Sequence, residues 1–565
     1  MIIGLAIRNA PAIVRLNFHP LERFGELAVK ALPAGRGVML SDFPQKLAVF
    51  QVALAHHHDA ADWLAVDTHA LPTVQYRARL ERRQPAGWLT DANRHELTPL
   101  ETVQLLEQVA CTNRLFYLHP SHGHFFEAFY LEPAGPIYEM KLRGKNPLDI
   151  PPLSRTATDA NEKFWIGLWD KELAALEPPP GRQPTRLTKK LERFGVTPVP
   201  RRQDRLVAEW YSVPLEDWGV ALQKQGRWPE ARLRFEQALQ LNTNNLSARI
   251  SLACNTNLQA KTSMGLSDVP KVEKQLGNGD PVVLANRLNS LLNNGGPVDE
   301  PTVGFLLGGV FLQAGHLVQA AEQLERVRAL APGTPAPELA LAEIYNRLQM
   351  ADRALLLIDH LREVTAKLPA NSSLDLNLAL LEFHSWLLQT NLSNARSALQ
   401  SVVERHPDDA QVRSRVLGAE LAISDFTNAL RLVELQLAKT PDDVSSLNSQ
   451  AIILLQSGQA EKAISILDHV LTLTNLPAAR INRALARLTR QDFALAESDF
   501  RELEKNGGTP GIANFGLAVV AEHRHDTNQA MRYFRLCLTN TPAGTPLWRK
   551  ASASLQALDP AAIAK

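Results

Sequence analysis

Cysteine is scarce in this chain of 565 residues, which contains only Cys111, Cys254 and Cys537. The three lie far apart in the sequence and fit neither a disulfide framework nor a zinc site, so we expect three small buried hydrophobic side chains. An excess of one charge is also lacking, because 60 Lys and Arg oppose 59 Asp and Glu. The formal net charge of +1 therefore predicts no nucleic-acid partner.

Long hydrophobic runs are missing as well. The apolar run at residues 1–7 stops at Arg8, whereas a spanning helix needs ~20 apolar residues. It also lacks the basic start of a signal peptide. Taken as complete, the sequence predicts a cytoplasmic chain without an export signal.

The common catalytic signatures are absent. The sequence contains no phosphate-binding G-x-x-x-x-G-K-[ST], no G-x-G-x-x-G after a strand, no H-E-x-x-H and no G-x-S-x-G. These absences predict a protein that is not an enzyme and that has no cofactor.

Residues 1–177 combine β-like and helical segments. Short apolar strands are expected at Gly37–Ser41, Trp63–Asp67 and Leu115–His119, and a hairpin around Pro133-Ala134-Gly135. Helical segments lie between these strands. The alternation predicts an α/β domain with a mostly parallel sheet and helices on both faces.

Residues 178–205 are rich in proline and carry eight basic against two acidic residues. Because proline can neither continue a helix nor donate to a strand ladder, we expect an extended linker here.

Residues 206–558 are dominated by a repeat. A small residue is followed four positions later by a large apolar one, and the small residues are Ala231, Ala320, Ala354, Ala395, Ala429, Ala463, Ala496 and Ala530. After the first, long step to Ala320, these alanines recur at nearly constant spacing, with one longer step before Ala395. A period of about 34 residues with two helices per period resembles the tetratricopeptide repeat. We expect an all-α superhelical solenoid of about eight recognisable repeats, with degenerate units at 246–300 and a capping helix after Pro546.

Polar residues follow the three predicted parallel strands. They include Asp42, Asp67, His119, Ser121, His122 and Glu127. Ligands of open α/β sheets bind at the carboxyl ends of the strands, so these residues form a candidate small-ligand site. The alternative is that they cap helices and turns. His124 adds a third histidine, but no fourth ligand is specified and no metal site is predicted.

The first helix of each tetratricopeptide repeat lines a concave groove. In the last repeats the expected groove residues are Asn448, Ile452, Leu485, Phe515, Val519 and Glu522. Such an apolar surface suits a helical or extended peptide of a partner protein. The alternative is that many of these side chains belong to the core between repeats.

A second resemblance covers residues 8–360. It rests on RNAPAI (8–13), LPAGRGVMLSD (32–42), HPSHGHFFEAFYLEPAGPIYEMK (119–141), YSVPLEDWGVALQKQGRWPEA (211–231) and GGPVDEP (295–301). These segments resemble the soluble tail of a bacterial family of polytopic membrane proteins related to GT-C glycosyltransferases such as protein O-mannosyltransferases. The spanning helices and catalytic carboxylate of that family have no counterpart in this sequence.

Two hypotheses follow. The first is a non-catalytic scaffold whose groove binds a protein or peptide; the resemblance implies that it is the soluble tail, or split partner, of a GT-C-like membrane system and lies on the periplasmic face. The second is an α/β domain that binds or processes a sugar or nucleotide-sugar, with the repeats as accessory. The sequence makes no prediction of oligomeric state.

Overall fold

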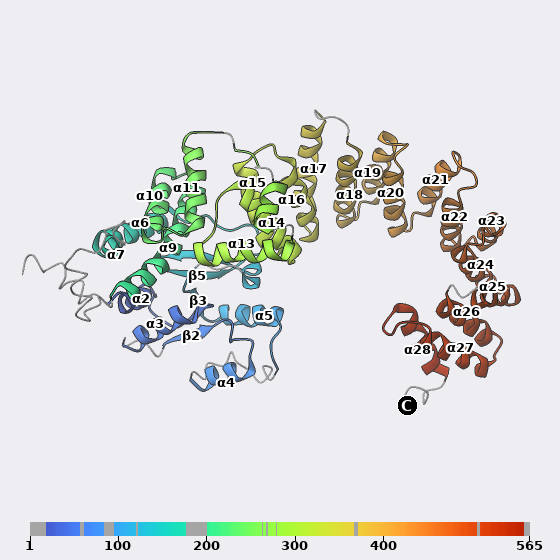
Figure 1. Ribbon diagram of the computed structural model, residues 1–565, viewed down its shortest axis with the longest axis horizontal. Coiled ribbons are helices and arrows are strands. Elements are labelled where there is room, and N and C mark those ends of the chain that lie inside the picture. Colours follow the sequence, from blue (N-terminus) through green and yellow to red (C-terminus); the bar gives the residue numbers. More distant parts are fainter. Residues whose placement is uncertain are drawn as a thin grey trace, which may run out of the picture. The chain divides into compact units, whose positions relative to one another are not determined.

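The computed structural model describes residues 19–56, 62–83, 95–119, 123–176, 200–262, 264–266, 269–277, 280–366, 371–505 and 509–558 (Figure 1). The chain divides into two compact units, Met1–Leu368 and Pro369–Lys565. This division differs from the one expected at 178–205. Most of the predicted linker, residues 178–199, lies outside the described residues, and the last six linker residues begin helix α9 (Pro200–Lys224).

The N-terminal sheet has five strands in the order β2-β1-β3-β5-β4. Strand β1 (Gly37–Ser41) pairs in parallel with β2 (Trp63–Asp67) and β3 (Arg114–Tyr117). Strand β5 (Ile137–Leu142) pairs antiparallel with both β3 and β4 (Phe129–Ala134). The sheet is therefore mixed, and the expectation of a mostly parallel sheet is wrong.

The hairpin explains this difference. Only Gly135 and Pro136 separate β4 from β5, and a connection that short forces antiparallel neighbours. Gly135 has a positive φ of 67°, which the turn requires. The hairpin then adds β5 to the edge of β3, so half of the strand pairings in the sheet are antiparallel.

Helices cover both faces of this sheet, as predicted. Helices α2 (Pro20–Lys30) and α3 (Pro44–Ala55) pack on the face that carries Met39 and Phe116. Helices α4 (Val74–Arg83) and α5 (Pro99–Ala110) pack on the opposite face, together with the 3-10 turn η3 (His124–Glu127). Neighbouring strand residues thus contribute to two separate cores, as the alternation of side chains in a strand requires.

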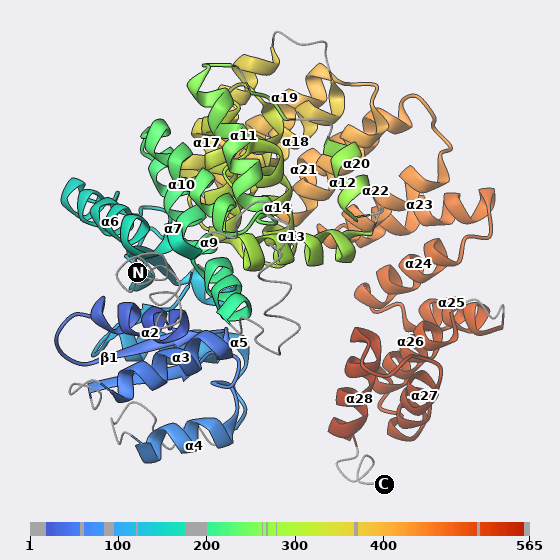
Figure 2. The ribbon, with the colours of Figure 1, turned by 60° about the vertical axis from the view of Figure 1, so that its left-hand side comes forward.

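The repeats form antiparallel helix pairs. In the first unit they are α9/α10 (Trp228–Leu241), α14 (Pro301–Gln313)/α15 (Leu317–Leu330) and α16 (Pro335–Arg347)/α17 (Ala351–Thr365). In the second unit (Figure 2) they are α18 (Ser372–Leu388)/α19 (Leu392–Arg405), α20 (Ala410–Ala422)/α21 (Phe426–Leu437), α22 (Val444–Gln456)/α23 (Ala460–Leu473), α24 (Pro477–Thr489)/α25 (Phe493–Lys505) and α26 (Pro510–His523)/α27 (Thr527–Thr539). The predicted capping helix is α28 (Pro546–Leu558).

The alanine register is confirmed. All eight alanines lie on the second helix of a pair and have no exposed surface. The large residue four positions later is also buried in every pair, from Phe235 to Phe534. A small residue lets the paired helices approach, and the large residue fills the space beside it.

The long step between Ala231 and Ala320 contains three helices, α11 (Leu246–Gln259), α12 (Val269–Gly277) and α13 (Pro281–Gly295). Helix α13 packs against α12, α11 and α9. The degenerate units expected at 246–300 therefore contain three helices.

The α/β part and the first repeats share one core. After the sheet, the chain continues through α6 (Arg155–Leu168), a π-helical turn η4 (Trp169–Leu173) and α7 (Ala174–Leu176). Phe24 of α2 contacts Trp210 and Tyr211 of α9, with ring centroids 5.2 and 5.3 Å apart. Glu162 of α6 accepts hydrogen bonds from Trp218 Nε1 and Arg234 Nη2, both at 2.6 Å. This shared core explains why the first unit extends to residue 368.

Two further sequence expectations have clear outcomes. Cys254 and Cys537 are buried, but Cys111 is exposed, so the prediction of three buried thiols is wrong for Cys111. Among the described residues, no helix combines the length and the apolar character that a membrane span needs.

Candidate functional site

The carboxyl ends of the parallel strands bring together part of the first candidate site. Asp42 after β1 and His119 after β3 are hydrogen-bonded through His119 Nε2. Lys46 lies near the pair and is 5% exposed. Burial lowers the pKa of Lys46 to about 8, against the opposing effect of Asp42. Burial also lowers the pKa of His119, which favours its neutral form.

One side chain of helix α9 lies beside this cluster. The Trp210 ring lies 5.9 Å from the Lys46 ammonium and 6.3 Å from the Phe43 ring, measured to ring centroids. Within the described residues, His119 Nδ1 and Thr68 Oγ1 are buried without hydrogen-bond partners. Neither of these two atoms has accessible surface for a ligand to contact, whereas the Asp42 side chain is 24% exposed.

The other predicted ligand residues have different roles. Asp67 accepts hydrogen bonds from the backbone N–H groups of His69 and Ala70, at 2.9 and 3.3 Å, and stabilises a turn. Glu127 accepts from the N–H groups of Val318 and Gln319, at 2.9 and 3.2 Å, and caps α15. These two therefore follow the capping alternative. Ser121 and His122 lie outside the described residues.

The position eleven residues before each buried alanine lies on the first helix of the repeat, and it is equivalent in all eight repeats. The residues at this position, called here the ladder, are Val220, Gly309, Glu343, His384, Gly418, Ile452, Leu485 and Val519. Val220 is buried, whereas the other seven are half-buried or exposed. The ladder therefore marks a face that does not belong to the core between paired helices.

The predicted groove residues lie on this face of the second unit. Leu485 is 42% exposed, and Ile452 and Val519 are half-buried. Asn448 accepts a hydrogen bond from Asn482 at 3.0 Å. Phe515 is half-buried because it packs edge-to-face on Phe534, with ring centroids 5.7 Å apart. Glu522, one turn beyond Val519, is exposed.

In the first repeat, the same face is occupied by the chain itself. Gly296 lies against α9, where an added Cβ would come within 2.7 Å of Glu216 Oε2 and 3.3 Å of the Val213 carbonyl oxygen. Gly296, Val298 and Asp299 are buried. We call residues 295–300 the groove segment. The repeat pattern does not predict this contact, although the motif at 295–301 and the long step from Ala231 to Ala320 mark its position.

Asp299 anchors the groove segment. Its carboxylate accepts one hydrogen bond from Gln223 Nε2 at 2.7 Å and two from the Arg326 guanidinium, both at 2.6 Å. Its backbone N–H donates to Ser251 Oγ, which in turn donates to Glu216 Oε1 at 2.9 Å. Burial, reinforced by the nearby Asp217 carboxyl, raises the pKa of Glu216 well above its ordinary value.

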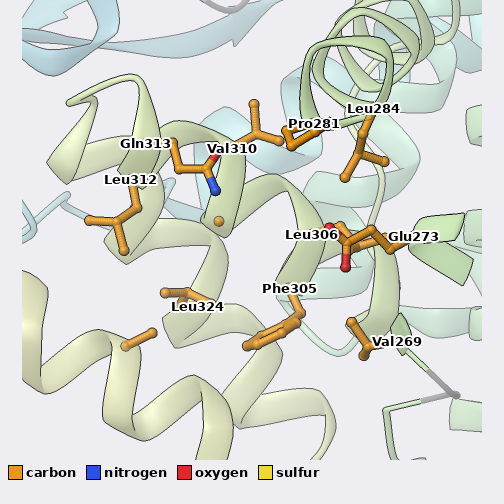
Figure 3. A pocket seen from close by; sticks show the side chains of 12 residues that line it. Val269, Glu273, Pro281, Leu284, Phe305, Leu306, Val310, Leu312, Gln313 and Leu324 are labelled. Carbon is orange, nitrogen blue, oxygen red and sulfur yellow. The ribbon is translucent and has the colours of Figure 1, made fainter. Parts of the chain in front are cut away.

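A cavity of about 180 Å³ lies on the corresponding face of the next repeat (Figure 3). Half of its lining residues come from α14, and the others come from α12, α13, α15 and α16. The α14 residues include Phe305, Gly309, Leu312 and Gln313. In the repeat register, Phe305, Gly309 and Leu312 take the places of Glu216, Val220 and Gln223. The cavity therefore occupies the site that the groove segment fills one repeat earlier.

An arginine cluster replaces part of the apolar packing in the α24/α25 pair. Asp499, 3% exposed, accepts hydrogen bonds from Arg483 and Arg487, and Arg480 lies 3.9 Å away. In the preceding repeat, Arg480 and Arg487 correspond to the apolar Leu447 and Leu454. The repeat pattern alone does not predict this polar core.

One region of the second unit matches a known protein family. Residues 481–545 match the family described as "Tetratricopeptide repeat". The chain contains tetratricopeptide repeats. The match spans α24 to α27, and the same alanine register extends through the other helix pairs.

Solved tetratricopeptide structures are also similar to this chain. The C-terminal part of a repeat-containing protein from Cytophaga hutchinsonii has 19% identity and a TM-score of 0.32, over 44% of this chain and 99% of that one. A tetratricopeptide repeat protein from Parabacteroides merdae has 16% identity and a TM-score of 0.29, over 45% and 96%. At these scores, the structures carry no argument about function. No curated protein matches the sequence.

Proposed function

We propose that the chain is a non-catalytic scaffold that binds a segment of a partner protein on the ladder face of its second unit. The observation that carries the proposal is that three apolar side chains at equivalent positions of successive repeats, Ile452, Leu485 and Val519, are half-buried or exposed. Apolar side chains repeated on one face are typical of a surface for an extended or helical peptide.

The first repeat supports this proposal. There the ladder face holds the groove segment, so in this chain the face accommodates extended polypeptide. The second unit has no described segment of its own that plays the equivalent part, and its ladder residues from His384 to Val519 are exposed or half-buried. The scaffold hypothesis therefore assigns this part of the ladder to a partner.

The binding surface has few charges near its apolar residues. Glu522 is the acidic residue among the predicted groove side chains, and its neighbours there are apolar or neutral. Because salt screens only the charged contribution, we expect an affinity that depends weakly on ionic strength. An extended partner would add backbone hydrogen bonds to side chains such as Asn448.

The test places a charge in this surface. Leu485→Glu puts a carboxylate at an exposed position, so the fold should survive while the partner is lost. Leu495→Glu is the matched control, because Leu495 is 54% exposed on α25, away from the ladder. The amount of partner protein that co-purifies with each full-length variant measures how much binding is lost. Equal retention by the two variants would reject the ladder as the binding surface.

The more specific hypotheses rest on sequence alone. The link to a GT-C-like membrane system and its periplasmic face stays a prediction of the second resemblance, and the comparisons do not support it. The sugar-binding alternative needs a ligand at the strand ends, where the two polar atoms without a hydrogen-bond partner, His119 Nδ1 and Thr68 Oγ1, are buried. We therefore do not advance it as a second function.

A further inference from the structure

The cavity beside Gly309 is built by an insertion into the repeat array. Its wall includes Val269 and Glu273 from α12 and Pro281 and Leu284 from α13, opposite α14 (Figure 3). A regular tetratricopeptide step has no room for these helices, whereas the long step from Ala231 to Ala320 contains them. The cavity is therefore a feature of this chain and not of the repeat in general.

The lining indicates what the cavity accepts. Glu273 and Gln313 are its two polar side chains, and the remaining lining residues are aliphatic, aromatic, proline or glycine. An apolar cavity of roughly 150 Å³ holds one benzene molecule. At about 180 Å³, this cavity fits one aromatic ring or one branched aliphatic group.

The groove segment indicates how a polypeptide lies on this face. Gly296 contacts Glu216, and three residues later Asp299 contacts Gln223. Three extended residues span ~10 Å, and the seven helical positions from 216 to 223 span about the same length. The segment therefore runs extended and parallel to α9.

Helix α14 offers an equivalent path for an extended polypeptide in the next repeat. Phe305, Gly309 and Leu312 repeat the positions of Glu216, Val220 and Gln223 one repeat earlier. The groove segment leads directly into the start of α14 at Pro301. Gly309 has no side chain, and an added Cβ would meet no atom within 4 Å. A backbone can thus approach α14 closely while one of its side chains enters the cavity.

We propose that this cavity receives one aromatic or branched aliphatic side chain of an extended partner polypeptide that lies along α14. The proposal rests on the scaffold function and adds a second contact point, in the first unit, with a defined side-chain preference. The mostly apolar lining disfavours a charged residue at the inserted position, because transfer of a charge from water into apolar surroundings is costly, and Glu273 in the wall adds repulsion against an acidic one.

The experiment uses the full chain and five capped pentapeptides, Gly-Ser-X-Ser-Gly, in which X is Phe, Leu, Lys, Asp or Gly. Ligand-observed NMR titration measures their binding, and p-cresol serves as a free aromatic probe. The Phe and Leu peptides should bind at least about tenfold more tightly than the other three, as burial of one such side chain provides. Equal binding of all five peptides would overturn the proposal. So would binding of p-cresol as tight as that of the Phe peptide, since it would assign the cavity to a free small molecule.

Filling the cavity tests its location. Gly309→Leu should weaken binding of the Phe and Leu peptides at least about tenfold. The open space around Gly309 should let the variant fold. Gly167→Leu is the matched control, because Gly167 also lies in a helix with no atom within 4 Å of an added Cβ. Leu312→Glu is a second variant that places a carboxylate in the wall and should have the same effect. Unchanged peptide binding in Gly309→Leu, with its circular dichroism preserved, would overturn the proposal.

A further variant separates this proposal from the scaffold function. Leu485→Glu should leave binding of the pentapeptides unchanged, because Leu485 lies in the second unit. If Leu485→Glu abolishes pentapeptide binding and Gly309→Leu does not, the scaffold function stands and the cavity proposal fails. If Gly309→Leu abolishes it while Leu485→Glu retains every partner, the cavity proposal stands and the ladder proposal fails.

Discussion

Removal of the Asp499 carboxylate should unfold the α24/α25 pair locally. The carboxylate accepts hydrogen bonds from Arg483 at 2.6 and 3.1 Å and from Arg487 at 2.7 Å. The arginine side chains are only 15% and 13% exposed. In Asp499→Ala, two guanidinium groups would therefore stay mostly buried without their main partner.

The magnitude follows from this burial. Loss of one partner from a buried ion pair costs about 3–5 kcal/mol, because the remaining charge is uncompensated. Asp468 also contacts Arg483, at 2.7 Å, but its side chain is 50% exposed. Since exposed pairs contribute about 0–1 kcal/mol, Asp468→Ala is the matched control with a small expected effect.

Hydrogen–deuterium exchange at α23 to α25 provides the assay, because it reports on this region separately from the first unit. Asp499→Ala should speed exchange there far more than Asp468→Ala. A third variant copies the preceding repeat through Arg480→Leu, Arg483→Gln, Arg487→Leu and Asp499→Ile, and it should be as stable as the natural chain or more so. The reasoning is refuted if Asp499→Ala exchanges like the natural chain, or if the copied repeat is the least stable variant.

Three further predictions concern stability. Ala463→Glu should destabilise the second unit by about 3 kcal/mol or more, measured by calorimetry, since Ala463 is fully buried between α22 and α23; an unchanged melting curve would contradict the register. Burial, with the Asp425 charge, raises the pKa of Glu420 from 4.5 to about 7, so its ionisation opposes folding as the pH rises from 4.5 to 7. Glu420→Gln should accordingly stabilise the chain by up to about 3 kcal/mol at pH 8 and little at pH 5 in urea titrations, and a gain equal at both pH values would contradict this. Glu127→Ala should cost about 1–2 kcal/mol and speed amide exchange at Val318 and Gln319, whose N–H groups it caps; unchanged exchange there would exclude the cap.

The repeat architecture could be predicted from sequence because it depends on local spacing. A small residue at the contact of two paired helices leaves a mark once in every repeat, and all eight predicted alanines are fully buried. The mixed sheet could not be predicted in the same way. The pairing of β5 with β3 depends on which edge the hairpin reaches, and strand propensity does not determine that edge.

The site residues show the same limit. Asp42 and His119 follow adjacent parallel strands, so their pairing is predictable, but the Trp210 side chain that lies beside the neighbouring Phe43 and Lys46 comes from a helix much later in the chain. The contact of Asp299 with Gln223 likewise joins residues from distant elements. The cavity beside Gly309 depends on how α12 and α13 fold back on α14. Such long-range packing leaves no periodic pattern in the sequence.

Position-dependent photo-crosslinking tests the scaffold proposal most directly. A photo-reactive amino acid replaces either Leu485 on the ladder or Leu495 on α25, which are 42% and 54% exposed. The proposal predicts that a partner protein crosslinks at position 485 and not at position 495, and that the crosslinked partner peptide carries apolar residues. Crosslinks at position 495 alone, or equal crosslinks at both positions, would contradict it.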